Sequence, residues 1–261
     1  MADYHKEKFK KIAEDTQSIF DSGGFKEEID YCYTNTRLYE PGGIFVNLEV
    51  EQKEDVEISV IESTTTNAAY EMFERFGRAC VLNFASAKKP GGGWKNGSVA
   101  QEESLARVSG LYYSLIKYNE IYKGKWAESN YYQDYYIYSE DVPFIKDDEG
   151  ILMNTVPISV ITSASVNRNC FKTITEDIEN TIEHIMRKRI NDIFRVAINN
   201  GQRHIVLGAY GCGVFKNDSK DVAEYFKDSL GRYKNSFDSI VFAIYDNTPN
   251  KEVLNNFKSI I

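Results

Sequence analysis

The sequence predicts an α/β fold with a β-sheet between helical layers, and three observations predict it. Strand-like apolar runs alternate with helical patterns from mid-chain onward. Residues 79–85 (ACVLNFA) are apolar on both faces, as in a central strand covered by helices. The 261 residues can bury a large core, and no linker divides them, so we expect one domain over residues 1–261.

The first third of the chain predicts a helix followed by short strands. Apolar residues recur on one face over about residues 6–20, and Ser22-Gly23-Gly24 ends this helix. It belongs to an N-terminal helical flank of about residues 1–40. Strands are expected at 44–50, 56–61 and 79–85, with a helix over 67–75.

The rest of the chain continues the alternation. A helical period covers residues 98–118, and the acidic turn 146–149 joins strands at 137–145 and 150–155. This turn has too few ordered ligands to favour calcium over a solvated turn. A strand at 157–164 precedes a long helix, which the capping box Thr173-x-x-Glu176 opens and Asn200-Gly201 closes. We then expect a strand at 204–209, a helix from about Asp218, a strand at 239–245, and a last helix with Pro249 at its first position.

The charge balance excludes one class of binding surface. Lys and Arg number 31 against 39 Asp and Glu, which gives a formal charge of −8. Proteins that neutralise many phosphates need clustered Lys and Arg. We therefore expect no broad nucleic-acid surface, and any nucleotide must be bound locally.

The sequence also gives expectations about disulfides, metal sites and membrane spans. The cysteines form no CxxC pair and no secretory leader is evident, which predicts reduced thiols in the cytoplasm; they are Cys32, Cys80, Cys170 and Cys212. The histidines have no ligand-like spacing, so we expect no metal site; they are His5, His184 and His204. The longest apolar and glycine run, residues 205–215, is shorter than the roughly 20 residues of a membrane span.

Two glycine-rich loops are candidates for binding an anion. The later one, GAYGCGVF over residues 208–215, stands between a strand and a helix, where backbone N–H groups can converge on a phosphate. Such turns also occur for packing alone, and the loop is neither a Walker loop nor a dinucleotide fingerprint. The earlier one has Gly91, Gly92 and Gly93 after Pro90. Three adjacent glycines are costly to order, so something large is expected to pass close to the backbone.

A carboxylate pair follows the earlier loop. Gln101, Glu102 and Glu103 open an amphipathic helix, where acidic residues also favour the helix dipole. These acidic residues could therefore serve only the start of the helix. The alternative interpretation is that one of the two carboxylates acts as an acid and a base on a sugar. A neighbouring carboxylate and substrate phosphates would raise the pKa of such a group, whereas the helix dipole would lower it.

These motifs together resemble a known family. Gly91-Gly92-Gly93, a spacer of residues 94–100 and Gln101-Glu102-Glu103 are similar to the signature of the macrodomain-type poly(ADP-ribose) glycohydrolases. The segments around them resemble the shorter microbial branch: LNFASAK at 82–88, SLARVSGLY at 104–112 and GAYGCGVF at 208–215. The likeness covers nearly the whole chain.

The resemblance implies a macrodomain-like three-layer fold, a mixed central sheet between helical layers. It also implies hydrolysis of the ribose–ribose O-glycosidic bond of poly(ADP-ribose), which releases ADP-ribose from chain ends without a cofactor. The expected partners are ADP-ribose, poly(ADP-ribose) and ADP-ribosylated proteins. A hydrolase of mono-ADP-ribosyl groups on protein or nucleic acid stays open. A binding module without turnover is less favoured, because a binder gains nothing from carboxylates beside a diphosphate.

The resemblance also implies a role for each site residue. Glu103 would be the catalytic acid and base, and Glu102 would hold ribose hydroxyls. The Gly91–Gly93 loop would pass the diphosphate and the distal ribose, and Gly211–Gly213 would embrace the diphosphate from the other side. Asn83 would reach the ribose and Phe215 would pack on the nucleoside. The full set of predicted substrate-binding residues is Asn83, Gly91, Gly92, Gly93, Gln101, Gly211, Cys212, Gly213, Val214 and Phe215.

Overall fold

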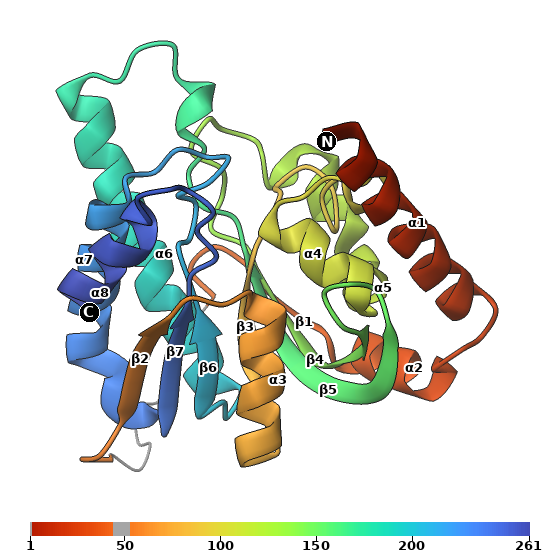
Figure 1. Ribbon diagram of the computed structural model, residues 1–261. Coiled ribbons are helices and arrows are strands. Elements are labelled where there is room, and N and C mark those ends of the chain that lie inside the picture. The colour runs from red at the N-terminus through yellow and green to blue at the C-terminus, as the bar shows by residue number, and fades with distance from the viewer. Residues whose placement is uncertain (1, 44–52) are drawn as a thin grey trace.

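A seven-stranded sheet runs through the described residues, 2–43 and 53–261, of this computed structural model (Figure 1). In chain order its strands are β1 (Arg37–Tyr39), β2 (Glu57–Ile61), β3 (Cys80–Phe84), β4 (Tyr136–Lys146), β5 (Leu152–Ser163), β6 (His204–Leu207) and β7 (Ser239–Ala243). Across the sheet the order is β1-β4-β5-β3-β6-β7-β2. The five strands from β5 to β2 are parallel, whereas β4 is antiparallel to β5 and to β1. The predicted mixed α/β fold is confirmed.

Helices cover both sides of this sheet. They are α1 (Ala2–Asp21), α2 (Lys26–Asn35), α3 (Thr65–Phe76), α4 (Gln101–Val108), α5 (Leu111–Leu115), α6 (Glu176–Asn199), α7 (Ser219–Tyr233) and α8 (Glu252–Ile260). Shorter helical turns lie at Trp94–Asn96, Ile116–Tyr118, Ile121–Lys125, Arg168–Cys170 and Lys234–Ser236. In Figure 1, α6, α7 and α8 gather at the left and α1, α4 and α5 at the right, with the sheet between them.

Alternation along β3 shows how one strand serves two cores. Cys80 and Leu82 pack in a cluster with α6, α7 and α8, whereas Val81 packs in a second cluster with α3, α4 and α5. Side chains of a strand point to opposite faces in turn, so an all-apolar run must be covered on both sides. The prediction for residues 79–85 is confirmed for this reason.

The N-terminal flank is helical as predicted, but it contains two helices and a short strand in place of one helix. The first helix is α1, and the sequence analysis did not separate α2 from it or foresee the short edge strand β1. The strand expected at 44–50 lies outside the described residues.

The helix expected over residues 98–118 is wrong as a single element. It breaks after α4, because Ser109 is extended, with φ −146° and ψ 173°. Its hydroxyl donates to Leu105 O and accepts the N–H of Leu111, so it closes one helix and starts the next. A Cβ on Gly110 would stand 2.4 Å from Ile29 Cδ1 and 2.9 Å from Pro143 Cγ. The break lets α2 and β4 approach the chain closely here.

The two strands expected at 150–155 and 157–164 are one strand, β5. The sequence predicts the start of a new strand at Pro157, but this residue lies within β5, opposite Pro143 of β4. A strand proline removes a ladder donor. Pairing the two prolines places both missing donors at one position of the β4–β5 ladder.

Two helix starts also differ from the predictions. The cap of α6 is Thr175, whose hydroxyl accepts the N–H of Ile178, and not Thr173. The last helix starts at Glu252 and not at Pro249. Its N-terminus is satisfied by Asp246, whose Oδ2 accepts the N–H groups of Val253 (2.9 Å) and Leu254 (3.3 Å). A carboxylate outside the helix therefore caps α8.

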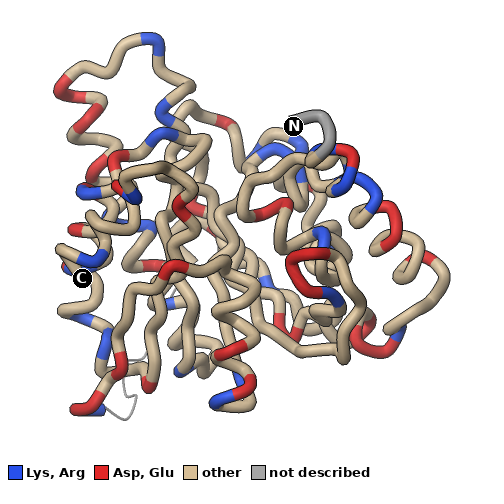
Figure 2. The backbone as a smooth tube through the Cα atoms, in the orientation of Figure 1, with Lys and Arg blue, Asp and Glu red and all other residues tan. Residues whose placement is uncertain are grey.

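Within the described residues, no helix is both long and apolar enough to cross a bilayer. No group of three or more His, Cys, Asp or Glu side chains that could hold a metal ion occurs in that part of the chain either. Lys and Arg are interspersed with Asp and Glu along the backbone (Figure 2).

A buried lysine attaches α1 to the sheet. The Lys146 side chain is 1% exposed, and its ammonium donates to Asp15 Oδ2 (2.6 Å) and Thr16 Oγ1 (2.8 Å) on α1. It also approaches Ile12 O at 3.4 Å. The α1 helix packs on α4, so Lys146 indirectly supports the element that carries the two adjacent glutamates.

We expect Lys146→Met to lower the free energy of unfolding by about 2 kcal/mol, because the buried hydroxyl of Thr16 and the carboxylate of Asp15 lose a charged donor. Denaturant unfolding measures this loss. The matched control is Lys10→Met, since the Lys10–Glu14 pair on α1 is exposed, and we expect it to change stability by less than about 0.5 kcal/mol. Equal losses in the two variants would contradict the role given to Lys146.

Candidate active site

The first turn of α4 is fastened to the end of β3. Gln101 accepts the N–H of Phe84 (2.9 Å) through Oε1, and through Nε2 it donates to Leu82 O (2.8 Å) and Thr65 Oγ1 (3.1 Å). The cap residue of α4, Ala100, has no side chain able to cap. The Gln101 amide thus fixes the start of α4 to the sheet, and all of these contacts are internal to the protein.

Glu102 is a buried carboxyl held by the protein. It is 2% exposed. Its Oε2 accepts the N–H of Ser86 at 2.7 Å, and its Oε1 accepts from Asn83 Nδ2 at 3.3 Å. Burial raises the pKa of Glu102 to about 8, with Glu103 adding to the rise, although the Ser86 and Gly91 N–H groups and the Asn83 amide oppose it. Burial wins, so the carboxyl is mostly neutral at pH 7.

Glu103 has one fixed oxygen and one free oxygen. Its Oε1 accepts the N–H of Gly93 at 2.8 Å. Its Oε2 is buried and has no hydrogen-bond partner among the described residues. A carboxylate oriented through one oxygen, with the other unpartnered, has the form of a general acid or base waiting for a substrate.

The glycines of the earlier loop make room for these carboxyls. Gly92 has φ +60°, and a Cβ there would lie 2.4 Å from Glu103 Oε1 and 3.1 Å from Glu102 Oε2. A Cβ on Gly93 would lie 2.5 Å from Ser98 Oγ. The groups that lie close to this backbone therefore include the protein's own side chains. The sequence analysis did not foresee that these side chains would need the space that the glycines leave.

The N–H groups of this loop are also already used. Gly91 donates to Glu102, Gly92 to Lys89 O (3.0 Å) and Gly93 to Glu103. The backbone donors of residues 91–93 are therefore occupied in the free protein, and the passage of the diphosphate and distal ribose along this loop stays a prediction. The loop holds the carboxyls in place.

The later loop has the opposite character. The N–H groups of Gly213, Val214 and Phe215 donate to no residue that the structure describes, whereas Cys212 N–H donates to Ala209 O. Val214 is 65% exposed, and a Cβ on Gly213 would meet nothing within 4 Å. Three successive free donors on an exposed loop form a nest that suits an anion.

Buried contacts hold this loop in shape. Gly211 has φ +78°, and a Cβ there would lie 2.3 Å from Ser165 Oγ. Asn217 donates from Nδ2 to Gly211 O (3.1 Å) and Val166 O (2.8 Å). The Phe215 ring meets Tyr132 edge-on at 6.1 Å. The sequence analysis missed Ser165, Asn217 and Tyr132, because Ser, Asn and Tyr in loops carry no distinguishing spacing.

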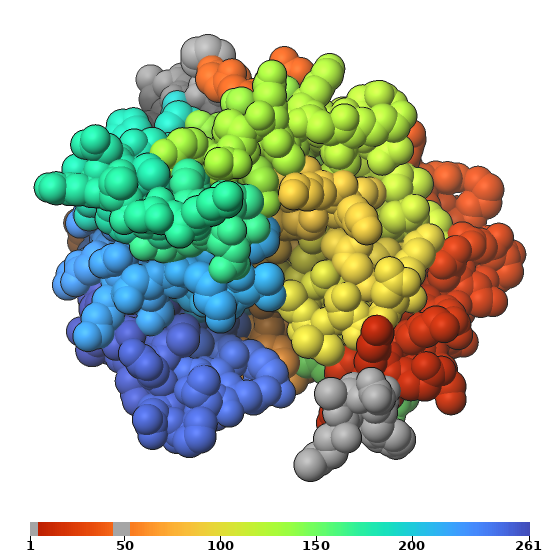
Figure 3. Space-filling model, turned by 90° about the horizontal axis from the view of Figure 1, so that it is seen from above, coloured from red at the N-terminus to blue at the C-terminus, as the bar shows by residue number. Residues whose placement is uncertain are grey.

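The structure brings the two loops to one edge of the sheet. They follow β3 and β6, which are parallel neighbours, so their carboxyl ends meet. A Cβ on Gly208 would lie 2.9 Å from Phe84 Cζ. Figure 3 views the molecule from above, and the yellow segment meets the teal and blue segments near the centre of this face. The predicted residues thus form two groups that face a common edge.

Further unpartnered polar atoms lie among the buried side chains. Among the described residues, and besides Glu103 Oε2, they are Asn83 Oδ1, Tyr122 Oη, Trp126 Nε1 and His204 Nδ1. Burial raises the pKa of Tyr122 well above its ordinary value, and the charge of Glu102 adds to the rise. Tyr122 is therefore a neutral donor near the carboxyl pair, and sequence reasoning gave no signal for it. Asn83 Oδ1 is an acceptor next to Glu102.

Comparisons with known proteins show which family and which solved structures this chain resembles. The family model of the microbial-type PARG (poly(ADP-ribose) glycohydrolase) catalytic domain matches residues 7–147. The crystal structure of poly(ADP-ribose) glycohydrolase from Thermomonospora curvata is similar at 32% identity, with TM-score 0.91 over 98% of this chain and 100% of that chain. Its complex with the inhibitor ADP-HPD has 33% identity, TM-score 0.89 and the same coverage.

A second organism provides a further match. The Deinococcus radiodurans poly(ADP-ribose) glycohydrolase in complex with ADP-ribose is 34% identical, with TM-score 0.81 over 88% of this chain and 96% of that chain. The comparison with curated proteins found no match.

The raised pKa of Glu102 predicts a pH dependence of stability. In the folded chain Glu102 keeps its proton up to about pH 8. In the unfolded chain its pKa has the ordinary value of 4.5, so the proton is already lost below pH 8. The free energy of unfolding therefore falls as pH rises through this window. We expect the wild-type value to fall by about 2 kcal/mol more than that of Glu102→Gln between pH 6 and pH 8. Urea unfolding at both pH values tests this, and parallel changes in the two proteins would show that Glu102 is ionised when folded.

Proposed function

Because this chain belongs to the microbial-type poly(ADP-ribose) glycohydrolases, we propose that Glu103 is the catalytic acid and base of its reaction. The reaction is hydrolysis of the O-glycosidic bond between ribose units of poly(ADP-ribose), which releases ADP-ribose. One observation carries the proposal. Glu103 is oriented by Gly93 through one oxygen while its other oxygen is buried without a partner.

The proposed mechanism uses one carboxyl twice. Glu103 donates its proton to the oxygen that leaves, the 2′-oxygen of the neighbouring adenosine ribose, as the bond from this oxygen to the anomeric carbon breaks. The sugar passes through an oxocarbenium-like state, which the adjacent diphosphate stabilises. Water then attacks the anomeric carbon and gives a proton to Glu103. The carboxyl is restored, and the sum is the addition of one water across the bond.

The surrounding polar groups orient the sugar. Glu102 is mostly neutral at pH 7, so it can donate its O–H to a ribose hydroxyl without repelling the diphosphate. Asn83 Oδ1, which is buried and unpartnered, accepts a ribose hydroxyl in this proposal. Gln101 was predicted to bind substrate, but its hydrogen bonds are to the protein. We assign it to positioning α4.

The diphosphate is assigned to the later loop. Free N–H groups at Gly213, Val214 and Phe215 can donate to phosphate oxygens, whereas those at residues 91–93 are occupied. Cys212 supports the loop, since its N–H donates to Ala209 O. Phe215 provides an apolar surface for the nucleoside beside Tyr132.

The remaining parts of the proposal concern organisation and partners. A single macrodomain-type domain over residues 1–261 is supported by one sheet that takes strands from both ends of the chain. ADP-ribosylated proteins are proposed as carriers of the polymer. A cytoplasmic setting is supported by the cysteines, which are all free thiols. The unpartnered Glu103 oxygen favours turnover over a binding module.

We expect Glu103→Gln and Glu103→Ala to bind ADP-ribose with wild-type affinity but to lose at least about 100-fold in the rate of ADP-ribose release from polymer, because the proton donor is gone. Chromatography of the released ADP-ribose measures turnover, and calorimetry measures binding. The matched control is Glu176→Gln, a change on the exposed first turn of α6. Turnover near the wild-type rate in either Glu103 variant would remove Glu103 from the mechanism.

We expect Gly213→Val to lower ADP-ribose affinity about tenfold without changing the melting temperature. A Cβ at this position meets nothing in the free protein, so the added side chain interferes only with a bound diphosphate. Calorimetry and thermal unfolding test the two halves of this prediction. Gly231→Val is a control, since Gly231 on α7 is also open to solvent. Unchanged affinity in folded Gly213→Val would contradict the assignment of this loop.

A further inference from the structure

A cavity of about 300 Å³ lies beside the earlier glycine loop, and most of the residues that line it have no role assigned so far. We propose that it binds the adenosine 5′-phosphate part of the leaving unit, the ADP-ribose unit from which the terminal one is cleaved. This inference rests on the proposed function. The cavity is lined by Lys89, Pro90, Gly92, Gly93, Trp94, Lys95, Asn96, Tyr112 and Asn119.

Position is the first argument. Gly92 and Gly93 line the cavity and also contact Glu103, through a 2.8 Å hydrogen bond from Gly93 N–H and through the close approach at Gly92. The Glu103 carboxyl therefore lies next to residues that line the cavity, and the oxygen that it protonates in the proposed mechanism lies within contact distance of this carboxyl. That oxygen belongs to an adenosine ribose, so the base and 5′-phosphate on the same ribose must lie within a few bonds of it.

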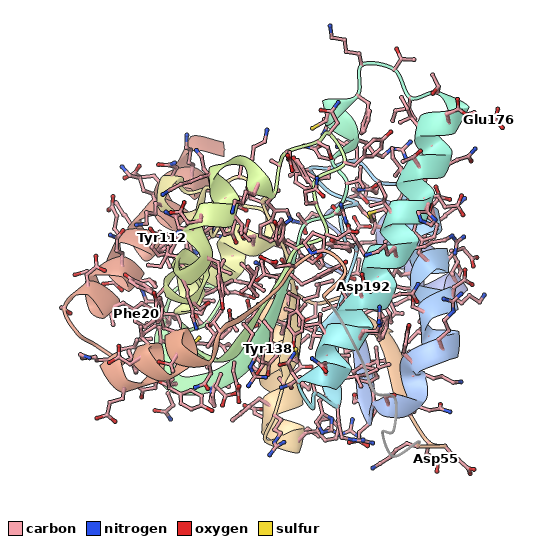
Figure 4. All side chains as sticks on the ribbon, turned by 180° about the vertical axis from the view of Figure 1, so that it is seen from behind. Phe20, Asp55, Tyr112, Tyr138, Glu176 and Asp192 are labelled. Atoms are coloured by element: carbon pink, nitrogen blue, oxygen red, sulfur yellow. The ribbon has the colours of Figure 1, made fainter. Side chains whose placement is uncertain are left out.

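Direction is the second argument. Figure 4 shows Tyr112 on the same side of the molecule as Phe20 of α1 and away from Asp192 and Glu176 of α6. The free N–H groups at residues 213–215 belong to the loop after β6, beyond β3 from α4. The terminal unit's diphosphate and the leaving unit would then lie on different sides of Glu103, as a bond cleaved between two units requires.

Charge is the third argument. The lining contains two lysines and no acidic residue. Lys95 Nζ lies 4.3 Å from the Tyr112 ring centroid and 5.5 Å from that of Trp94, so aromatic faces hold this cation in place of a carboxylate. The charge of Lys95 helps to lower the pKa of Asp21. The hydrogen bond to the Asp21 carboxylate, however, comes from the Tyr113 hydroxyl and not from Lys95. Lys89 makes no ion pair with a residue in the described ranges. Both cations are available to a phosphate.

Size and polarity select the occupant. A volume of about 300 Å³ is at the lower end of small-molecule sites, which suits one nucleotide rather than a whole ADP-ribose. The side chains of Asn96 and Asn119 make no hydrogen bond with a described residue, so their amides can meet a base or ribose. The backbone under Lys89 is fixed, because its N–H donates to Ser86 Oγ and its carbonyl accepts from Gly92.

The test compares two substrates that differ only in the leaving group. One is the ADP-ribose dimer, and the other is ADP-ribose with 4-nitrophenol on its distal ribose, which has no adenosine to occupy the cavity. For Lys89→Glu, and for Lys89→Glu with Lys95→Glu, we expect the ratio of kcat/KM for the dimer to kcat/KM for the aryl substrate to fall about tenfold. The control is Lys88→Glu, an exposed neighbour outside the lining, in which the ratio stays at the wild-type value.

The outcomes separate this inference from the function beneath it. A ratio unchanged in the Lys89 variants, or lowered equally in Lys88→Glu, overturns the cavity assignment while the wild-type chain still cleaves both substrates. Release of ADP-ribose from neither substrate by the wild-type chain would instead contradict the proposed function.

A binding measurement gives an independent readout. Adenosine 5′-phosphate is titrated into Glu103→Gln already saturated with ADP-ribose, so that only a second site can respond. We expect saturable binding that weakens about tenfold when Lys89→Glu is added. Absence of binding, or binding unaffected by Lys89→Glu, would overturn the assignment.

Discussion

The site depends on keeping a buried carboxyl, Glu102, at the end of a sheet. A buried carboxyl is costly unless polar groups satisfy it. The chain provides the N–H groups of Ser86 and Gly91 and the amide of Asn83. These groups come from β3 and the loop after it, so satisfying Glu102 also fixes α4 against the sheet. Glu103 then inherits its position from the same helix turn, with Gly93 selecting which of its oxygens stays free.

The two glycine-rich loops look alike in sequence but differ in function because their N–H groups differ. Those at residues 91–93 bond to protein acceptors, two of them the carboxyls of Glu102 and Glu103, whereas those at 213–215 bond to none that the structure describes. The loop at residues 91–93 therefore positions the two carboxyls, whereas the loop at residues 213–215 has donors free to bind an anion. This separation keeps a fixed anion cradle away from Glu102, where convergent donors would lower the carboxyl pKa.

Sequence reasoning worked where residue type alone restricts the structure. An all-apolar β3 must be central, and Gly91–Gly93 before Gln101–Glu103 is specific enough to identify the family. It failed where the partner of a polar side chain decides. Gln101 could bind substrate or backbone, and Thr173 or Thr175 could cap α6. Asp246 caps α8 from outside the helix. Such choices depend on which acceptor folding brings near, and spacing along the chain does not encode this.

An excess of 8 negative charges does not prevent this chain from acting on a polyanion, because the net charge of the whole chain does not set the local charge at the site. Burial keeps Glu102 mostly neutral at pH 7, and the proposed phosphate donors, the free N–H groups at residues 213–215, carry no formal charge. Screening weakens the distant surface carboxylates beyond about 8 Å at physiological salt. In the proposed mechanism the cleavage site therefore meets the terminal unit on local donors, and screening limits the repulsion from the rest of the surface.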